Sequence, residues 1–387
     1  MILRLLPIII LTLILPDLYI YFTFWKKRSY KQWKIALAFL PDFLLLIGGI
    51  ILCCNETLSP KNLTIIGIYL VIYMLVALPK TTFLLVDLLL CLFGLAWHPI
   101  KKYATPIAQI LRLVVFICIL IGTFYGPTHL VVKNAEVKSQ EVPESFNGYR
   151  IVQFTDLHLA SFEHHPTMIR TLVDTINALH PDMIVFTGDL VNTEYHELLP
   201  YIADLSRLNA RDGVFSILGN HDYHTYARNL TEAEQTKGLE RLKTLQRAMG
   251  WDLLLNENRI IKKGNDSIAI IGVENDGKPP FPERGDLRRA SAGVEKAVFK
   301  ILLSHDPSHW ERKVVEQTDI QLTLSGHTHG MQLMLFGWSP SKYVYPEWCG
   351  MYTENEQSLY VSLGVGGALI PFRLGAWPEI NVITLRH

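Results

Sequence analysis

The chain has 387 residues, of which 49% are hydrophobic and 19% are charged, and its formal net charge is zero. Residues 1–130 hold 11 of the 36 basic and 4 of the 36 acidic residues, so this part carries +7 and residues 131–387 carry −7. The long apolar runs of the first part exclude a wholly soluble protein, and the composition of the second excludes disorder, collagen and coiled coil.

Four stretches of residues 1–130 are long and apolar enough to be transmembrane helices. We expect them over residues 5–24, 35–54, 63–92 and 107–125. The third stretch stays apolar as far as Trp97, so it is either one long helix kinked at Pro79 or two short helices joined there. Basic residues, and no small-residue cleavage site, follow the first helix, which we therefore interpret as an anchor.

Basic loops indicate how these helices are oriented. One loop contains Lys26, Lys27, Arg28, Lys31 and Lys34, and another contains Lys101 and Lys102. Four helices place both loops on one side of the membrane, whereas five place them on opposite sides. The positive-inside rule favours four. We therefore expect a multi-pass protein of the plasma (inner) membrane whose C-terminal part is extracytoplasmic.

Three acidic residues lie inside the apolar stretches: Asp17, Asp42 and Asp87. Acidic residues within a membrane are a functional hypothesis by default. Asp17 and Asp42 each follow a proline, which favours the simpler interpretation that they cap helix segments near an interface. For Asp87 the functional and structural interpretations stay open.

Residues 131–148 are expected to be a linker, and residues 149–387 an α/β domain. Short β-branched runs predict strands, which begin at Ile151, Met183, Val214, Ile268, Ile301, Gln321, Leu359 and Val382. Helical patterns separate the early runs, so these strands should be parallel. The later runs follow one another over short turns, which suggests antiparallel additions.

Polar clusters follow five of these strands, where sites form in such sheets. The clusters are Asp156-x-His158, Gly188-Asp189, Gly219-Asn220-His221-Asp222, Ser304-His305 and Gly326-His327-Thr328-His329. Imidazole, carboxylate and amide ligands without a thiolate suit Mn, Fe or Zn. Seven such ligands from five loops fit two divalent ions, which clamp phosphoryl oxygens and lower the pKa of a bridging water.

Two details of this pattern need a particular geometry. Alternate residues at a strand end point in opposite directions, so Asp156 and His158 reach one ion only if the chain bends there. A carboxylate such as Asp189 can bridge two ions. His221, followed by Asp222, is the expected general acid, because a histidine oriented by a carboxylate suits that role.

A single Asp-x-His match is weak evidence for a metal site, because such matches are common by chance. Five such blocks in this order are a specific signal. From Tyr149 to the C-terminus they resemble the calcineurin-like metallophosphoesterases, whose pattern is DxH, GD, GNH[ED], H and GHxH. The resemblance implies a four-layer α/β/β/α sandwich and two metal sites. The first would take Asp156, His158, Asp189 and His329; the second would take Asp189, Asn220, His305 and His327. His221 matches the family's proton donor.

Further residues indicate which branch of the family the chain resembles. Gly326 to Gln332 and the later Trp338-Ser339-Pro340 are similar to a bacterial membrane-anchored branch that places about four helices before this domain. Purple acid phosphatases have a tyrosine three residues after the GD aspartate. Asn192 stands there in this chain, which disfavours an iron–tyrosinate site.

The expected function is therefore a membrane-anchored, dinuclear metal-dependent phosphoesterase. It would hydrolyse a phosphomonoester, phosphodiester or pyrophosphate bond of a small-molecule or lipid-linked envelope substrate, in contact with membrane lipid. The aromatic stretch Phe336–Tyr352 is either a wall of the site or an interfacial belt that touches lipid, or it is simply the packing of a long loop. Nucleic acid is not an expected partner, because the domain is net negative. The alternative is a transport or sensor protein in which the phosphoesterase domain is accessory.

Overall fold

A computed structural model describes residues 6–26, 30–54, 60–227 and 229–387. Leu5, Lys27 and Arg28, which the sequence placed in the first helix and its basic loop, lie outside the described residues. The chain divides into two compact units. The first contains the N-terminal helices up to Tyr125 together with Leu369–Phe372, and the second contains most of the chain from Gly126 onwards.

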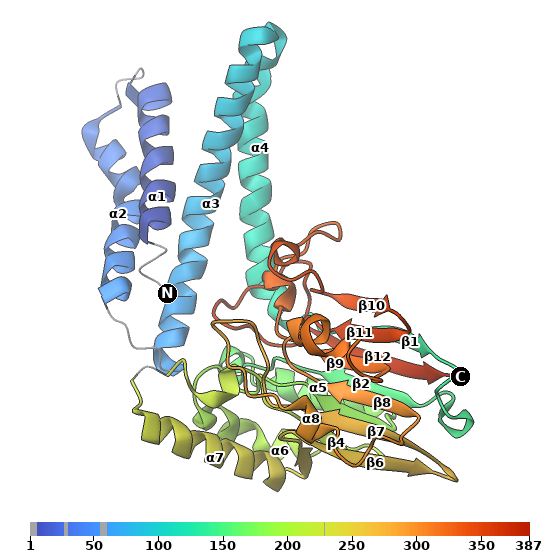
Figure 1. Cartoon of the computed structure of the whole chain (residues 1–387). Coiled ribbons are helices and arrows are strands. Elements are labelled where there is room, and N and C mark those ends of the chain that lie inside the picture. The colour runs from blue at the N-terminus through green and yellow to red at the C-terminus, as the bar shows by residue number, and fades with distance from the viewer. Residues whose placement is uncertain (1–5, 27–29, 55–59, 228) are drawn as a thin grey trace. The chain divides into compact units, whose positions relative to one another are not determined.

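Among its described residues, the first unit contains four long helices (Figure 1). They are α1 (Leu6–Ile20, continued by a π-helical turn at Tyr21–Trp25), α2 (Gln32–Cys54), α3 (Pro60–Ala96) and α4 (Lys101–Leu120, continued by Ile121–Tyr125). All four are long and apolar enough to cross a membrane. Of the two alternatives for the third stretch, the structure has the single helix, which runs through Pro79 without a break.

Asp17 and Asp42 are not helix caps, contrary to their interpretation from the sequence. Asp17 lies inside α1 and Asp42 inside α2. Both accept hydrogen bonds from the Nζ of Lys80 on α3. Asp87, also on α3, accepts from the Tyr19 hydroxyl at 2.6 Å and the Thr105 hydroxyl at 2.8 Å. The sequence could not reveal these contacts, because each joins different helices.

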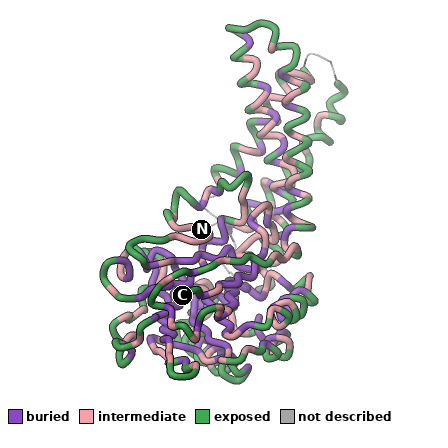
Figure 2. Tube along the Cα trace, turned by 90° about the vertical axis from the view of Figure 1, so that its right-hand side faces the viewer, coloured by how far each residue is buried: buried purple, intermediate pink, exposed green. Residues whose placement is uncertain are grey.

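The second unit contains two six-stranded sheets. In spatial order the first consists of β1 (Val131–Lys138), β12 (Glu379–Arg386), β2 (Arg150–Phe154), β3 (Met183–Phe186), β4 (Val214–Ser216) and β5 (Trp251–Leu253). The second consists of β10 (Gly350–Glu354), β11 (Gln357–Val361), β9 (Leu322–Ser325), β8 (Phe299–Leu303), β7 (Asp266–Gly272) and β6 (Glu257–Lys263). Figure 2 shows that buried residues are concentrated in the interior of this unit.

Three apolar clusters hold this unit together in four layers. Side chains such as Ile151 and Ile301 pack between the sheets. The opposite face of the first sheet packs against α5 (Thr167–Ala178) and α7 (Glu232–Ala248). The outer face of the second sheet packs against α8 (Leu287–Ala290) and the turn that carries Trp310. The fold is therefore the expected α/β/β/α sandwich, preceded by the helical region.

Strand directions follow the prediction only in part. Strands β2 to β5 are parallel, as expected. However, β7, β8, β9 and β11 are also parallel, so the expectation of antiparallel additions was wrong for them. Among the described strands, three pairs are antiparallel: β6 with β7, β10 with β11, and β12 with β2. Loops and short helical turns, such as α8, make the crossovers that long helices make in the first sheet.

The segment 131–148, expected to be a linker, contains strand β1. It pairs in parallel with β12 over the eight residues Val131–Lys138. The strand was missed because it lies at the edge of the sheet and most of its side chains are exposed, so it lacks the apolar run of a central strand. Only Val137 is fully buried. The sandwich therefore begins before Tyr149.

Candidate metal centre

The strand ends bring the polar clusters of the sequence together between the two sheets. Asp156 and His158 follow β2, Asp189 follows β3, Asn220 and His221 follow β4, His305 follows β8, and His327 and His329 follow β9. Five of these residues are among the most deeply buried polar groups of the chain, with exposures of 2% or less: Asp156, His158, Asp189, Asn220 and His305.

Left-handed backbone turns aim these side chains inward. Asp156, His158, Asp189, His327 and His329 all have positive φ, between 45° and 74°. This conformation costs non-glycine residues roughly 1–2 kcal/mol each and is typical of functional sites. The turn also explains how Asp156 and His158, two residues apart, can point to the same place. Strand β2 ends at Phe154, so the alternation of side chains along a strand no longer applies to them.

Glycines give these turns room. A Cβ atom on Gly219 would collide with the carboxylate of Asp189, and one on Gly326 would collide with the carboxylate of Asp156. The glycines of the GNH and GHTH blocks are therefore required by close approach to the two acids.

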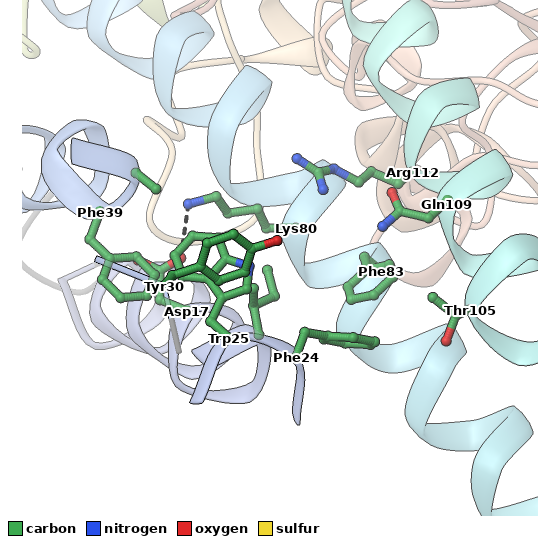
Figure 3. A pocket seen from close by; sticks show the side chains of 12 residues that line it. Asp17, Phe24, Trp25, Tyr30, Phe39, Lys80, Phe83, Thr105, Gln109 and Arg112 are labelled. Atoms are coloured by element: carbon green, nitrogen blue, oxygen red, sulfur yellow. Dashed lines mark hydrogen bonds and ion pairs between the residues drawn. The ribbon is translucent and has the colours of Figure 1, made fainter. Parts of the chain in front are cut away.

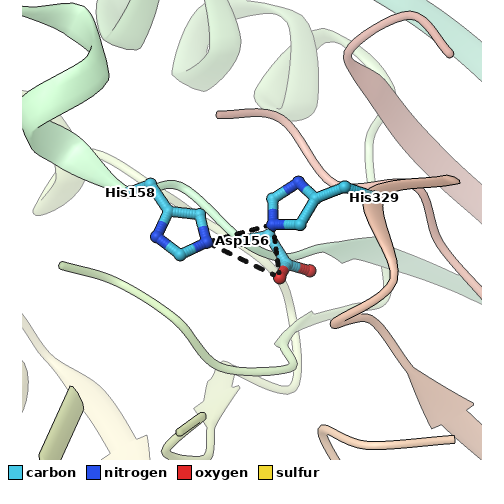
Figure 4. A group of neighbouring side chains, drawn as sticks. All are labelled: Asp156, His158 and His329. Carbon is cyan, nitrogen blue, oxygen red and sulfur yellow. Dashed lines mark hydrogen bonds and ion pairs between the residues drawn. The ribbon is translucent and has the colours of Figure 1, made fainter. Parts of the chain in front are cut away.

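One cluster of ligand atoms joins the ends of β2 and β9 (Figure 4). The Nε2 atoms of His158 and His329 lie 3.0 Å apart. The Oδ1 of Asp156 lies 3.2 Å from His329 Nε2 and 3.9 Å from His158 Nε2. Two imidazole nitrogens and a carboxylate oxygen thus converge on one small volume.

A second cluster joins Asp189, His305 and His327. Asp189 Oδ2 lies 3.2 Å from His305 Nε2, which in turn lies 3.3 Å from His327 Nδ1. The same Asp189 oxygen is 3.5 Å from His158 Nε2 in the first cluster. Asp189 therefore stands between the two clusters, in position to serve both.

Asn220 offers a further oxygen to a cation. Its Nδ2 donates to the Tyr226 hydroxyl at 2.9 Å. Its Oδ1 is buried and, among the residues that the structure describes, has no hydrogen-bond partner. A buried amide oxygen without a partner is costly unless something absent from the protein chain binds it, so this atom fits a metal ligand.

Hydrogen bonds orient the histidine rings. His305 Nδ1 donates to the Thr187 carbonyl at 2.7 Å, which leaves Nε2 for the site. His327 Nε2 meets the Tyr345 hydroxyl at 2.8 Å, which leaves Nδ1 for the site. Such partners fix both the tautomer and the direction of a metal-binding imidazole.

The electrostatics of the site favour a cation. Burial opposes ionisation of Asp189, but the imidazoles of His305 and His221 outweigh burial and hold the pKa of Asp189 well below its ordinary value. Burial likewise lowers the pKa of His305, but Asp189 outweighs it and the pKa rises to about 10. The protein thus stabilises positive charge between these groups, and a bound cation would take the place of that proton.

The sequence suggested that Asp222 orients His221, but among the described residues these two side chains have separate hydrogen-bond partners. His221 Nδ1 meets the carbonyl oxygen of Asn192 at 2.7 Å, and its ring lies face to face with Tyr226 at 4.2 Å. The carboxylate of Asp222 instead accepts backbone N–H groups of two ligand loops. These donors are Asp189 (3.0 Å), Leu190 (2.8 Å), Val191 (3.2 Å) and Gly219 (2.9 Å).

Sequence reasoning missed one side chain beside the site, Arg373, and left the place of another, Tyr345, open. Arg373 is 1% exposed, donates to the carbonyls of Gly366 and Ala376, and places Nη2 3.0 Å from His329 Nδ1. Tyr345 belongs to the aromatic stretch for which two interpretations stood open, and its contact with His327 makes that part of the stretch a wall of the site. By contrast, Tyr343 in the same stretch is 74% exposed.

Comparison with known proteins gives consistent results. The family model for calcineurin-like phosphoesterases matches residues 149–331. An uncharacterized metallophosphoesterase of Bacillus subtilis, YkuE, is 34% identical over 264 residues, which cover 65% of this chain and 83% of that protein. A Danio rerio transmembrane protein with a metallophosphoesterase domain is 30% identical over 73% of this chain and 63% of its own length. The UDP-2,3-diacylglucosamine pyrophosphatase LpxG of Chlamydia trachomatis is 29% identical over 58% of this chain and 81% of its own.

Proposed function

The chain belongs to the calcineurin-like metallophosphoesterases, a family of hydrolases with a dinuclear divalent metal centre, and from that premise we propose which residues hold the metals and what the enzyme cleaves. The first metal site consists of Asp156, His158, Asp189 and His329. The second consists of Asp189, Asn220, His305 and His327. The observation that supports this assignment best is the position of Asp189 Oδ2, within 3.5 Å of an imidazole nitrogen of each cluster.

Nitrogen and oxygen donors without a thiolate fit Mn, Fe or Zn. When bound, two such ions supply charge that holds phosphoryl oxygens and make a water acidic enough to attack phosphorus near neutral pH. The protein's own part is to keep Asp156 and Asp189 ionised, to fix the ring of His305 through Thr187, and to exclude bulk water from the buried ligands.

We assign the proton transfer to His221. Its Nδ1 is engaged by the Asn192 carbonyl, so Nε2 is the atom that can deliver a proton to the leaving oxygen. The stacked Tyr226 ring and the edge of His158 hold the imidazole in place, with ring centroids 4.2 Å and 4.7 Å away. His221 is partly exposed, as a group that must reach a substrate should be, whereas the proposed ligands other than His327 are buried.

The substrate class follows from the membrane region. The chain is a membrane protein with four helices that can span a bilayer. A relative bears the name of a pyrophosphatase acting on a diacylated sugar nucleotide. We propose a lipid-linked or envelope substrate with a phosphate ester or pyrophosphate bond. The basic loops favour an extracytoplasmic catalytic domain in the plasma membrane, and reporter fusions after Tyr125 test that side.

A His221→Ala substitution in the full chain tests the function. We expect metal content to stay as in the native protein, while hydrolysis of a chromogenic phosphodiester and of lipid-linked pyrophosphates falls by roughly a hundredfold or more. His196→Ala, which removes an exposed imidazole, is the matched control and should keep full activity. Native activity in the His221 variant would refute the assignment, and activity on soluble monoesters alone would refute the substrate class.

A second candidate, a transport or sensor protein with an accessory phosphoesterase domain, is favoured by the ion cluster of Lys80 with Asp17 and Asp42. The discriminating test is whether a chain beginning at Gly126 restores the cellular phenotype of a deletion. Complete restoration by this chain would dismiss the second candidate.

A further inference from the structure

The helical unit contains a cluster of charges that hydrolysis does not use. Lys80 Nζ lies 2.8 Å from Asp17 Oδ1 and also pairs with Asp42. The three residues come from three different helices, and together they carry one positive and two negative charges. Because charges are costly inside a bilayer, such residues face a partner or a polar cavity.

A cavity of about 450 Å³ lies beside this cluster and is lined by all four helices (Figure 3). Its polar side chains include Asp17, Lys80, Gln109 and Arg112. A neighbouring cavity of about 560 Å³ shares Lys80, Gln109 and Arg112 and adds Asp42. The volume is that of a small-molecule site and far exceeds the space needed by one ion.

Arg112 supplies the charge that balances the cluster. Its guanidinium extends from α4 into the cavity (Figure 3), and no residue in the described part of the chain forms a hydrogen bond or ion pair with it. A guanidinium cannot lose its proton in a protein, so it needs an anionic partner or water. With Arg112 included, the charges of Asp17, Asp42, Lys80 and Arg112 sum to zero.

The side of the cavity opposite Arg112 is suited to a cation. Trp25 stacks on Phe39 with ring centroids 5.2 Å apart and meets Tyr30 edge to face at 6.3 Å. Asp17 lies beside these rings (Figure 3). Aromatic faces next to a carboxylate are a common binding arrangement for amines.

We propose that this cavity binds the headgroup of a zwitterionic phospholipid, with the phosphate at Arg112 and Gln109 and the ammonium at Asp17 against Trp25. A guanidinium matches phosphate oxygens through two parallel N–H donors. The charges of the cavity sum to zero, and a headgroup without net charge keeps that sum at zero. An anionic headgroup would add an unpaired negative charge near Asp17 and Asp42.

The depth of the cavity is compatible with a lipid. Trp25 and Tyr30 are residues of the kind that mark a membrane interface, and they lie at the ends of α1 and α2 where the basic loop begins. Arg112 lies seven residues beyond Thr105, another cavity residue, and thus about 10 Å deeper at 1.5 Å per residue. A long arginine side chain covers part of that distance toward a headgroup.

Native mass spectrometry of the detergent-purified full chain tests this proposal, with phosphatidylethanolamine, phosphatidylglycerol and inorganic phosphate offered separately. We expect phosphatidylethanolamine to bind at least about tenfold more tightly than phosphatidylglycerol, a difference of 1.4 kcal/mol. Arg112→Gln and Asp17→Asn should each weaken that binding about tenfold. Lys102→Gln, which removes a charge from the exposed start of the same helix, should not.

Each other outcome overturns the proposal. Equal binding of phosphatidylglycerol that is indifferent to Asp17→Asn would identify an anionic-lipid site. Saturation by inorganic phosphate alone would identify a free-anion site. Binding that is unchanged in both cavity variants would place the lipid elsewhere. Size-exclusion chromatography and thermal unfolding of the full chain show whether each variant is folded. If Arg112→Gln is not folded, Arg112→Lys replaces it, because it keeps the charge but loses the planar fork of donors, and it should also weaken binding.

Discussion

At the scale of single residues, the buried carboxylate of Asp222 organises the loops of the candidate metal centre. Its two oxygens accept four backbone N–H groups from the loops after β3 and β4. Burial and the nearby charge of Asp189 raise its pKa to about 7, so the site holds it under electrostatic strain. Its role is to fix the loops that carry Asp189 and Asn220.

An Asp222→Asn substitution should therefore destabilise the fold. It turns an amide NH₂ toward backbone donors, which should lower the free energy of unfolding by about 1–3 kcal/mol. His221→Asn, at the neighbouring position, should leave stability unchanged and reduce only activity. Thermal unfolding of the purified full chains distinguishes the two. A native unfolding temperature for the Asp222 variant would show that the loops do not depend on this carboxylate.

His309 makes stability depend on pH. Burial, only partly opposed by Asp276, lowers its pKa from 6.5 to about 4. The folded state thus binds fewer protons than the unfolded state between these values. The free energy of unfolding is therefore not reduced by His309 above about pH 6.5. As the pH falls from 6.5 toward 4, protonation of His309 in the unfolded state lowers it by up to about 3 kcal/mol.

A His309→Gln variant should show a shallower loss of stability over that interval. The relevant measurement is the denaturation midpoint of the full chain at several pH values between 7 and 4, compared with the native chain. Identical pH dependence in the two chains would mean that His309 does not carry the effect.

Residues of the site differed in how well they could be predicted. Asp156, Asp189 and His305 each follow a buried strand directly, so pattern alone placed them at one edge of the fold. Arg373 and Tyr345 reach the site from long loops, and their contacts depend on how those loops pack. The hydrogen-bond partners of Asp222 differ from those expected, because neighbours in sequence need not face each other at the end of a strand.

At the scale of elements, β1 defines where the second unit begins. It covers the edge of β12 over eight paired residues, and Val137 contributes to the core between the sheets. A chain that begins at Tyr149 would expose the edge of β12, and exposed edges pair with other chains.

We therefore predict that a chain beginning at Gly126 is monodisperse and stable, whereas one beginning at Tyr149 aggregates or unfolds at a lower temperature. Size-exclusion chromatography and thermal unfolding of both chains measure this. Equal behaviour of the two would mean that β1 is dispensable, as a linker would be.

The elements also show which parts of a fold the local pattern encodes. Helical patterns between β2, β3 and β4 revealed the parallel order of the first sheet. The crossovers of the second sheet use loops and short turns, so the same cue was missing and its parallel strands were taken for antiparallel ones. The edge strands β1, β6 and β10 have exposed side chains and therefore no apolar run to reveal them.

At the scale of the whole molecule, the zero net charge conceals two differently charged parts. Several basic residues that contribute to the +7 of residues 1–130 lie near helix ends, among them Lys34, Lys101 and Lys102, whereas Lys80 and Arg112 lie well inside α3 and α4. The −7 of residues 131–387 includes Asp156 and Asp189, whose charge two divalent cations would reverse locally. A substrate phosphate would therefore meet a positive site in a negative domain.

The measurement that tests the central claim most directly is the number of metal ions bound by the full chain, together with its hydrolysis of a chromogenic phosphodiester. We predict about two Mn²⁺ ions for the native chain and for Asp174→Asn, a surface control. Asp189→Asn should retain at most one ion and lose activity by about a hundredfold or more. Two bound ions and native activity in the Asp189 variant would contradict a dinuclear centre shared at Asp189.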